Sequence, residues 1–363
     1  MAVREPDPVK QEAFAGRMVQ VLNDACLGFM ASVGHQTNLF DTMAGLDAST
    51  SAEIADAGGL DERYVREWLG AMVVGGIVDY DPEHRSYTLP PEHAASLVRA
   101  AGPENMAGLM QYLALMGEVE QRVVESFRQG GGVPYTAYPR FQALQAEESA
   151  RVYDLALVDG IVPLVPGLTE RLRAGIDVLD IGTGQGHAVN VLAGAFPASR
   201  FTGLDIAENG IAAARAEAAA LGLANADFAV ADSAELAGPY DLVTAFDVIH
   251  DLARPARTLA AVAGALRSDG VFLMGDIAAS SLLEENIEHP LGPALYALST
   301  FYCMTVSLGE GGEGLGTVWG EQTARRMLAE AGFGAVEVER VEGDELNLYY
   351  VARPDGRVAD GDG

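Results

Sequence analysis

Three glycines follow an apolar strand with one residue between each pair, and this stretch has the composition of a ligand-binding loop. The residues from Val178 to Gly186 read VLDIGTGQG. Glycine lacks a Cβ, so Gly182 and Gly184 can adopt positive φ and turn backbone N–H groups toward a ligand at the start of the next helix. Asp180 stands at the carboxyl end of the strand, where open α/β sheets bind ligands. A tight turn without a ligand is the alternative for such a loop taken alone.

The glycine spacing distinguishes between two nucleotide-type ligands. The dinucleotide fingerprint requires glycine or alanine at its sixth position, which is His187 here, so the loop argues against NAD. The order Asp-x-Gly-x-Gly-x-Gly resembles the first motif of class I S-adenosylmethionine-dependent methyltransferases. The resemblance implies S-adenosylmethionine as the cofactor, bound by Asp180, Gly182, Thr183, Gly184 and Gly186.

Further acids stand at the ends of three later strands, at 200–205, 227–231 and 240–246. Asp205 comes 23 positions after Gly182, about the interval at which this fold places a carboxylate on the two ribose hydroxyls. In the methyltransferase pattern, an Asp-Ser pair after the third strand meets the adenine, and residues after the fourth strand border the methionine moiety. Capping of a following helix is the alternative for these acids. The resemblance adds these residues to the cofactor set: Asp205, Ile206, Asp232, Ser233, Phe246 and Asp247.

The order of elements from 171 to 354 predicts a mostly parallel α/β sheet. A fifth strand at 270–276 is followed by a helix near 320–331 and by strands at 334–339 and 346–352. No crossover helix separates the last two strands, so we expect them to be antiparallel neighbours. The resemblance implies the same arrangement, a Rossmann-like methyltransferase sheet with an antiparallel last strand.

The N-terminal third predicts an all-α winged-helix domain. Helical patterns run from about 10 to 69, and two short strands at 77–80 and 86–89 then flank a turn. Residues 37–95 contain eleven acids and three bases, and the whole chain carries a net charge of −29. Nucleic-acid binders neutralise phosphates with Lys and Arg, so this charge argues against DNA or RNA. The chain resembles small-molecule O-methyltransferases and bacterial relatives often labelled regulators, in which this module implies a homodimer.

The segment between the two domains has a helix at 104–129, a break of three glycines and a second helix at 147–164. Glycines beside a proline indicate a hinge or a lid. The aromatic residues Tyr135, Tyr138 and Phe141 could close over a cofactor or fill the seam between domains. We therefore expect four parts: a winged-helix domain at 1–100, a helical linker or lid at 101–170, the methyltransferase domain at 171–354 and a flexible tail at 355–363.

His250 follows the fourth strand and is the candidate general base for methyl transfer to a hydroxyl. A neutral imidazole accepts a proton near neutral pH, and a sulfonium already carries an activated methyl group. His250 lies nine residues after Asp241 and precedes Asp251, which resembles the catalytic His-Asp of plant-type O-methyltransferases, although Leu252 stands where those enzymes commonly have tryptophan. A role in the pocket wall or as a hydrogen-bond partner of the cofactor is the alternative.

Several other side chains are assigned by position. His187 opens the helix after the glycine loop and is expected to be structural, whereas His289 lies after the fifth strand and could face the acceptor. The segment around Trp319 is one that the related bacterial enzymes share. The expected acceptor-side residues are Tyr138, His289, Tyr302 and Trp319. The sequence predicts no metal site.

Composition predicts a cytoplasmic enzyme without a membrane span. Cys26 and Cys303 have no metal or disulfide spacing and suit a reducing compartment. The first residues lack the apolar core of a signal peptide. The uncharged stretch 291–309 approaches the length of a bilayer span, but it lies between strands of one sheet and predicts a buried helix over the active site.

The sequence therefore predicts a homodimeric S-adenosylmethionine-dependent methyltransferase that acts on a small molecule at oxygen. A winged-helix transcriptional regulator that uses the methyltransferase fold as a ligand sensor is the second interpretation. An RNA methyltransferase is the third interpretation, ranked last because the negative net charge argues against binding nucleic acid.

Overall fold

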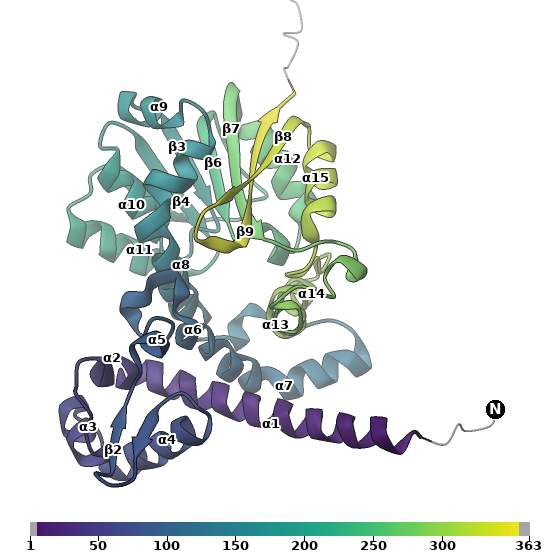
Figure 1. Cartoon of the computed structure of the whole chain (residues 1–363). Coiled ribbons are helices and arrows are strands. Elements are labelled where there is room, and N and C mark those ends of the chain that lie inside the picture. Colours follow the sequence, from purple (N-terminus) through teal and green to yellow (C-terminus); the bar gives the residue numbers. More distant parts are fainter. Residues whose placement is uncertain (1–5, 356–363) are drawn as a thin grey trace, which may run out of the picture. The chain divides into compact units, whose positions relative to one another are not determined.

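The computed structural model describes residues 6–355, and the chain divides into two compact units, Met1–Ala114 and Leu115–Gly363 (Figure 1). The predicted tail at 355–363 lies outside the described residues except for Asp355. Among the residues described, no single helix is long and apolar enough to cross a bilayer. One strongly bent pair, Phe141–Leu164 with Leu168–Ala174, reaches the required length and composition only when the two are joined.

The first unit is a helical module with a two-stranded wing. Helix α1 (Pro8–Gln36) begins after Asp7, whose side chain accepts a hydrogen bond from the backbone N–H of Val9. The wing strands β1 (Asp79–Asp81) and β2 (Ser86–Thr88) pair antiparallel. The other helices of the unit are α2 (Leu39–Ala44), α3 (Ser51–Gly58), α4 (Glu62–Val74), α5 (Pro91–Ala94) and α6 (Met106–Leu109), with a 3-10 turn at Arg99–Glu104.

The core of this unit is built around an aromatic pair. Phe40 and Trp68 meet edge to face with ring centroids 5.2 Å apart, and the Trp68 indole N–H donates to the carbonyl of Met30 at 2.8 Å. A capping box fixes the start of α3, because Thr50 and Glu53 exchange side-chain to backbone hydrogen bonds. The predicted order of helix, helix and wing is confirmed.

The second unit is a seven-stranded sheet with helices on both faces (Figure 1). The strand order is β5-β4-β3-β6-β7-β9-β8, with β9 antiparallel to both of its neighbours and the other pairs parallel. This confirms the predicted sheet and its antiparallel last strand. The strands are β3 (Asp177–Ile181), β4 (Arg200–Asp205), β5 (Ala226–Val230), β6 (Tyr240–Phe246), β7 (Leu266–Ile277), β8 (Phe333–Val341) and β9 (Asp344–Pro354).

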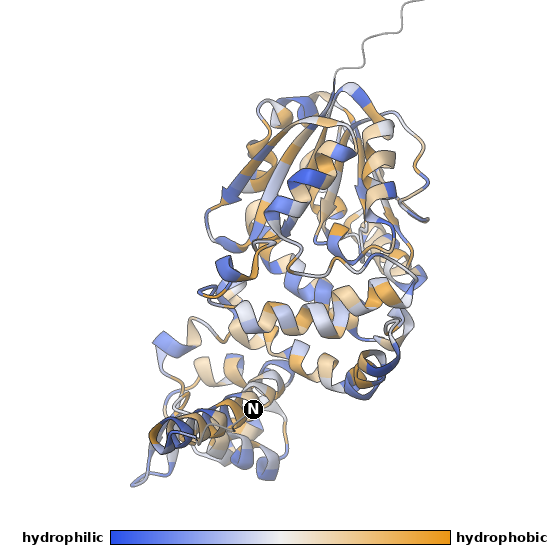
Figure 2. Cartoon of the chain, turned by 90° about the vertical axis from the view of Figure 1, so that its right-hand side faces the viewer, coloured by the Kyte–Doolittle hydropathy of each residue, from blue (hydrophilic) through white to orange (hydrophobic). Residues whose placement is uncertain are grey.

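Both faces of the sheet are buried, and Figure 2 shows apolar residues along the strands between the helices. In β3, Val178 packs toward one face while Leu179 and Ile181 pack toward the other. Since helices cover both faces, a ligand reaches the sheet at the strand ends. The helices are α9 (Leu168–Ala174), α10 (His187–Ala195) and α11 (Glu208–Leu221) on the first face, and α12 (Pro255–Ala265) and α15 (Gly320–Glu330) on the second.

Two helical segments differ in detail from the sequence prediction. The helix expected at 104–129 begins at Met106 and is broken at Met110 into α6 and α7 (Gln111–Gln129). The helix expected at 147–164 starts earlier, as α8 (Phe141–Ala156), and then continues through a wide turn, Leu157–Ile161, and a tight turn, Val162–Leu164.

The stretch 291–309 is a helix, as expected, and it is interrupted only by a wide turn. Helix α13 (Gly292–Leu298) leads into the turn Ser299–Cys303 and then into α14 (Met304–Gly309). The turn and α14 bury most of their residues, including Tyr302, Thr305 and Ser307.

Candidate active site

The loop after β3 uses each of its three glycines differently. All three have positive φ, at 65° for Gly182, 56° for Gly184 and 75° for Gly186. A Cβ on Gly182 would lie 2.5 Å from the side chain of Val248, and one on Gly186 would lie 2.5 Å from Phe228. A Cβ on Gly184 would meet only the Gln142 amide oxygen, at 3.4 Å. Gly182 and Gly186 therefore serve packing, whereas Gly184 leaves backbone open to a ligand.

Two carboxylates lie at the strand ends beside this loop, and one of them accepts a hydrogen bond from it. Asp205 at the end of β4 accepts from the backbone N–H of Gly184 at 2.8 Å and from that of Ala207 at 2.8 Å. Burial raises the pKa of Asp205 despite these donors. Asp180 at the end of β3 accepts from the Thr244 hydroxyl at 2.6 Å, and burial raises the pKa of Asp180 to about 6.

A cavity of about 490 Å³ opens over the loop, a volume that suits a small-molecule site. Twelve of the predicted site residues line it, and five do not. The lining residues among the predictions are Asp180, Gly182, Thr183, Gly184, Asp205, Ile206, Asp232, Ser233, Phe246, Asp247, Asp251 and Tyr302. Those outside the lining are Gly186, Tyr138, His250, His289 and Trp319.

Asp232 and Ser233 lie in a turn after β5, where no helix starts, so they do not cap one. The Asp232 carboxylate accepts from the backbone N–H of Ala234 at 2.9 Å and pairs with Arg254. The Ser233 hydroxyl lies 3.5 Å from that of Thr258. Both residues face the cavity, as the adenine-side prediction requires.

Asp247 has an unusual backbone for a residue with a side chain. Its φ is 59°, a left-handed conformation that costs free energy outside glycine and is concentrated at functional sites. One of its carboxylate oxygens accepts from the Gln145 amide at 2.8 Å. The other oxygen is buried and has no hydrogen-bond donor among the described residues. This oxygen is available to a ligand that donates.

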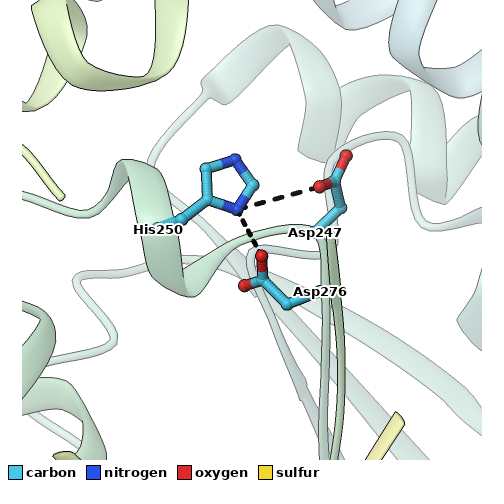
Figure 3. A group of neighbouring side chains, drawn as sticks. All are labelled: Asp247, His250 and Asp276. Atoms are coloured by element: carbon cyan, nitrogen blue, oxygen red, sulfur yellow. Dashed lines mark hydrogen bonds and ion pairs between the residues drawn. The ribbon is translucent and has the colours of Figure 1, made fainter. Parts of the chain in front are cut away.

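His250 is buried beside two carboxylates (Figure 3). Its Nδ1 lies 2.8 Å from Asp276 Oδ1 and 3.8 Å from Asp247 Oδ1. Asp276 Oδ1 also accepts from the Trp319 indole N–H at 3.0 Å and from the Ile277 N–H at 2.8 Å. Burial lowers the pKa of His250, but the Asp276 carboxylate and Cys303 outweigh burial and raise it well above its usual value.

The group formed by Asp247, His250 and Asp276 also has the composition of a cation site, because one ligand atom from each lies within 4.8 Å of the others. Asp276 Oδ1 is already shared by three donors, however, so the geometry favours a proton between His250 and Asp276. Sequence reasoning missed Asp276. Its position at the end of β7, next to the end of β6, is the same strand-end signal that identified the other acids.

Asp251 reaches the cavity that His250 does not. Burial raises the pKa of Asp251 to about 7, although the nearby His250 acts in the opposite direction. A carboxylate with this pKa is ionised in part at neutral pH and can take up a proton there. The predicted pair His250-Asp251 therefore has one member in the cavity wall and one behind it.

Aromatic side chains form another part of the wall. Phe141 of α8 stacks on Tyr302 with ring centroids 3.7 Å apart, and Tyr135 approaches Phe141 edge to face at 6.4 Å. All three line the cavity. Tyr138 lies behind them: its hydroxyl donates to the carbonyl of Phe301, and its ring supports Tyr302 at 4.9 Å. Tyr138 thus positions a wall residue.

The remaining predicted residues have structural contacts. The two ring nitrogens of His289 are engaged by backbone, Nε2 with the Ala278 carbonyl at 3.1 Å and Nδ1 with the Leu291 N–H at 3.1 Å. His187 is held between carboxylates of two helices, Asp154 at 2.7 Å and Glu217 at 2.8 Å, as its structural assignment implies. It also borders the cavity.

Comparison with protein families matches two separate parts of the chain. Residues 25–99 match the family described as Rv2258c-like winged HTH domain. Residues 172–332 match the family described as Methyltransferase domain. The chain is a methyltransferase with an N-terminal winged helix-turn-helix domain. This agrees with the enzyme class that the glycine loop predicted.

Solved structures show the same two-domain fold. A putative O-methyltransferase from Nostoc punctiforme matches with a TM-score of 0.71 and 19% identity, covering 96% of this methyltransferase and 99% of that chain. Human N-acetylserotonin methyltransferase in complex with SAM matches with a TM-score of 0.68 and 15% identity, covering 98% of this chain and 99% of that one. The mitomycin 7-O-methyltransferase MmcR matches with a TM-score of 0.66 and 18% identity, covering 96% of this chain and 100% of that one. The comparison with curated proteins gave no match. S-adenosylmethionine, the cofactor predicted from the sequence, agrees with these findings.

Proposed function

We propose that this methyltransferase transfers a methyl group from S-adenosylmethionine to a hydroxyl of a small molecule. The observation that carries the proposal is the cavity over the glycine loop, where Gly184 leaves backbone exposed and acids from four strand ends converge. The cofactor supplies an activated methyl group, so the protein has to bind, orient and remove a proton. Two of the three solved structures of the same fold named above are O-methyltransferases by name, which supports oxygen as the acceptor atom.

The lining residues suit the parts of this cofactor. The loop backbone at Gly184 suits the methionine carboxylate, and the Asp247 oxygen that accepts no hydrogen bond suits its ammonium group. Asp205 lines the cavity at the end of β4, and each of its oxygens accepts one backbone N–H and keeps a lone pair for a hydroxyl of the ribose. Asp232 and Ser233 suit the adenine.

We propose His250 as the proton acceptor, positioned by Asp276. The bond between Nδ1 and Asp276 fixes the ring, and Cys303 is a further hydrogen-bond partner of the imidazole. We assign proton uptake to Nε2. Asp251 is a second candidate, favoured by its place in the cavity wall and by its pKa of about 7. A cationic cofactor in the cavity would lower the pKa of both groups and so favour their proton-free forms.

We also propose that the enzyme is a homodimer built through the first unit. Helix α1 exposes a run of large apolar side chains, including Phe14, Met18 and Leu22. Exposed apolar patches of this kind usually mark interfaces. Leu27 and Met30, on the same helix, pack into the core of the unit instead.

A regulator that senses ligands with this fold is less well supported, because the winged helix lacks a basic surface.

Calorimetric titration with S-adenosylmethionine, S-adenosylhomocysteine and NADH tests the proposal directly. We expect both adenosyl compounds to bind and NADH not to bind. Incubation with radiolabelled cofactor and a panel of phenols and alcohols then tests transfer to oxygen. Binding of NADH alone, or sequence-selective DNA binding at physiological salt without any transfer, would contradict the proposal.

A further inference from the structure

Part of the cavity wall comes from segments that contribute nothing to the glycine loop. The turn before α14 supplies Tyr302, the residues after α14 supply Glu310, and the segment after β6 supplies Asp251. These segments are bonded to each other, since the Ser307 hydroxyl donates to the Leu252 carbonyl at 2.8 Å. We call this wall the acceptor wall.

Charge on the acceptor wall is of one sign. Asp251 and Glu310 are both acids. Among the described residues that line the cavity, the basic side chains are Arg254 and His187, and each is already engaged, Arg254 by Asp232 and His187 by its two carboxylates. An anionic acceptor would therefore meet carboxylates without a free cation to pair with, and it would be repelled.

The aromatic part of the wall favours the opposite charge. The face of an aromatic ring attracts a cation, most strongly where water is excluded. Phe141 and Tyr302 are stacked, and Tyr135 lies beside them at the cavity. Rings next to carboxylates are the chemistry that recognises an ammonium group. The net charge of −29 adds a long-range attraction for cations.

The cofactor does not account for all of these acids. Asp180, Asp205, Asp232 and Asp247 follow strand ends around the glycine loop, where the cationic cofactor would bind. Glu310 belongs to the segment after α14 and to no strand end. We assign its charge to the acceptor.

We propose that the acceptor is a small hydroxylated aromatic molecule that carries an ammonium group, with this group bound by Glu310 beside the Phe141–Tyr302 stack. The reacting hydroxyl rests on the proposed function, whereas the charge preference is a property of the cavity itself.

Three phenols of nearly equal size test the charge preference: 4-(2-aminoethyl)phenol, 4-(2-hydroxyethyl)phenol and 4-hydroxyphenylacetate. Their binding to the full-length protein saturated with S-adenosylhomocysteine is measured by calorimetry, which does not depend on turnover. We expect the ammonium compound to bind about 10-fold or more tightly than the neutral one, and the carboxylate most weakly. Glu310→Gln should reduce the preference for the ammonium compound to about 3-fold or less. Glu313→Gln makes the same charge change at an exposed residue outside the cavity and should retain the preference.

Equal or tighter binding of the neutral or carboxylate compound overturns the proposal, as does failure of all three to bind. An unchanged preference in Glu310→Gln overturns the assignment of the binding group. Methyl transfer from S-adenosylmethionine is measured in parallel. Tight binding of the ammonium compound without its methylation supports the charge preference and contradicts the proposed O-methylation alone.

Discussion

The carboxylate of Asp205 accepts a hydrogen bond from the backbone N–H of Gly184 at 2.8 Å and so joins the end of β4 to the loop after β3. The same carboxylate accepts from Ala207 with its other oxygen. An amide in its place can accept with one atom only. Asp205→Asn should therefore weaken S-adenosylmethionine binding about 10-fold or more, since a lost buried hydrogen bond costs about 1–3 kcal/mol. Calorimetry checks this, with Asp227→Asn at an exposed residue of β5 as the control.

The glycines of the loop should separate binding from folding. Gly184→Ala adds a methyl group where only the Gln142 amide lies near, so it should weaken cofactor binding and lower the melting temperature only through backbone strain. Gly186→Ala puts its methyl group against Phe228 and should lower the melting temperature by several degrees. Both residues have positive φ, so the backbone strain is common to the two variants. Equal melting temperatures would show that the contacts at Gly186 do not matter.

The pH dependence of turnover, together with variants, should identify the proton acceptor. A carboxylate or an imidazole accepts a proton only after losing its own, so kcat/KM must rise with pH through the pKa of the acting group. Both candidates have a raised pKa, about 7 for Asp251 and well above 6.5 for His250, so the rise shows that a proton acceptor acts and variants of each residue show which one it is. Asp251→Asn and His250→Gln should differ, with a loss of about 10²–10⁴ in kcat for the acting group alone. Near-native turnover in both variants would remove both assignments.

His187 should make the stability of the second unit depend on pH. Burial lowers its pKa, but Asp154 of α8 and Glu217 of α11 outweigh burial and raise it above 6.5. The charged ring therefore stabilises the fold fully below pH 6.5, and this contribution is lost as pH rises through the raised pKa. Thermal melting of the native protein and of His187→Gln across this range checks the sign. The difference between the two should shrink with rising pH, and a constant difference would contradict the assignment.

Charges on α1 should separate the proposed dimer. Phe14 and Leu22 are exposed on this helix, so replacing both with glutamate leaves the core intact. In a dimer interface the new carboxylates would be buried, which should destabilise the dimer. Light scattering of the native protein should give twice the chain mass of 38.1 kDa, and the double variant should give the single value. Glu12→Gln, on the same helix, serves as the control. A native monomer would refute the proposal.

The loop and the strand-end acids were predictable because their requirements are local. Positive φ at Gly184 and a carboxylate at the end of each strand leave a direct trace in the sequence. The environment of His250 leaves none, since Asp276 is 26 residues away and Trp319 lies 43 residues beyond that. Pairing of β6 with β7 brings these side chains together. His289 was predicted to face the acceptor, but both of its ring nitrogens contact backbone groups. The sequence pattern gives no sign of these contacts.

The fold was predicted more completely than its boundaries. The antiparallel pairing of β8 and β9 follows from the short interval between the two strands, which leaves no room for a crossover helix. The start of α8 at Phe141 does not, because Arg140 before it makes no side-chain capping hydrogen bond and residues 141–146 therefore follow no start signal. Those residues include Phe141, Gln142 and Gln145, which the sequence analysis left outside the cofactor set.

Trp319 gives the enzyme a built-in optical probe. The chain has two tryptophans, and Trp68 lies in the core of the first unit, where phenylalanine is a moderate replacement. In a Trp68→Phe variant, all tryptophan fluorescence comes from Trp319. The Trp319 indole N–H donates to Asp276, the carboxylate that is also hydrogen-bonded to His250. Indole emission responds to the electric field at the ring. Proton uptake and ligand entry beside His250 can therefore be followed by fluorescence in real time, without any label.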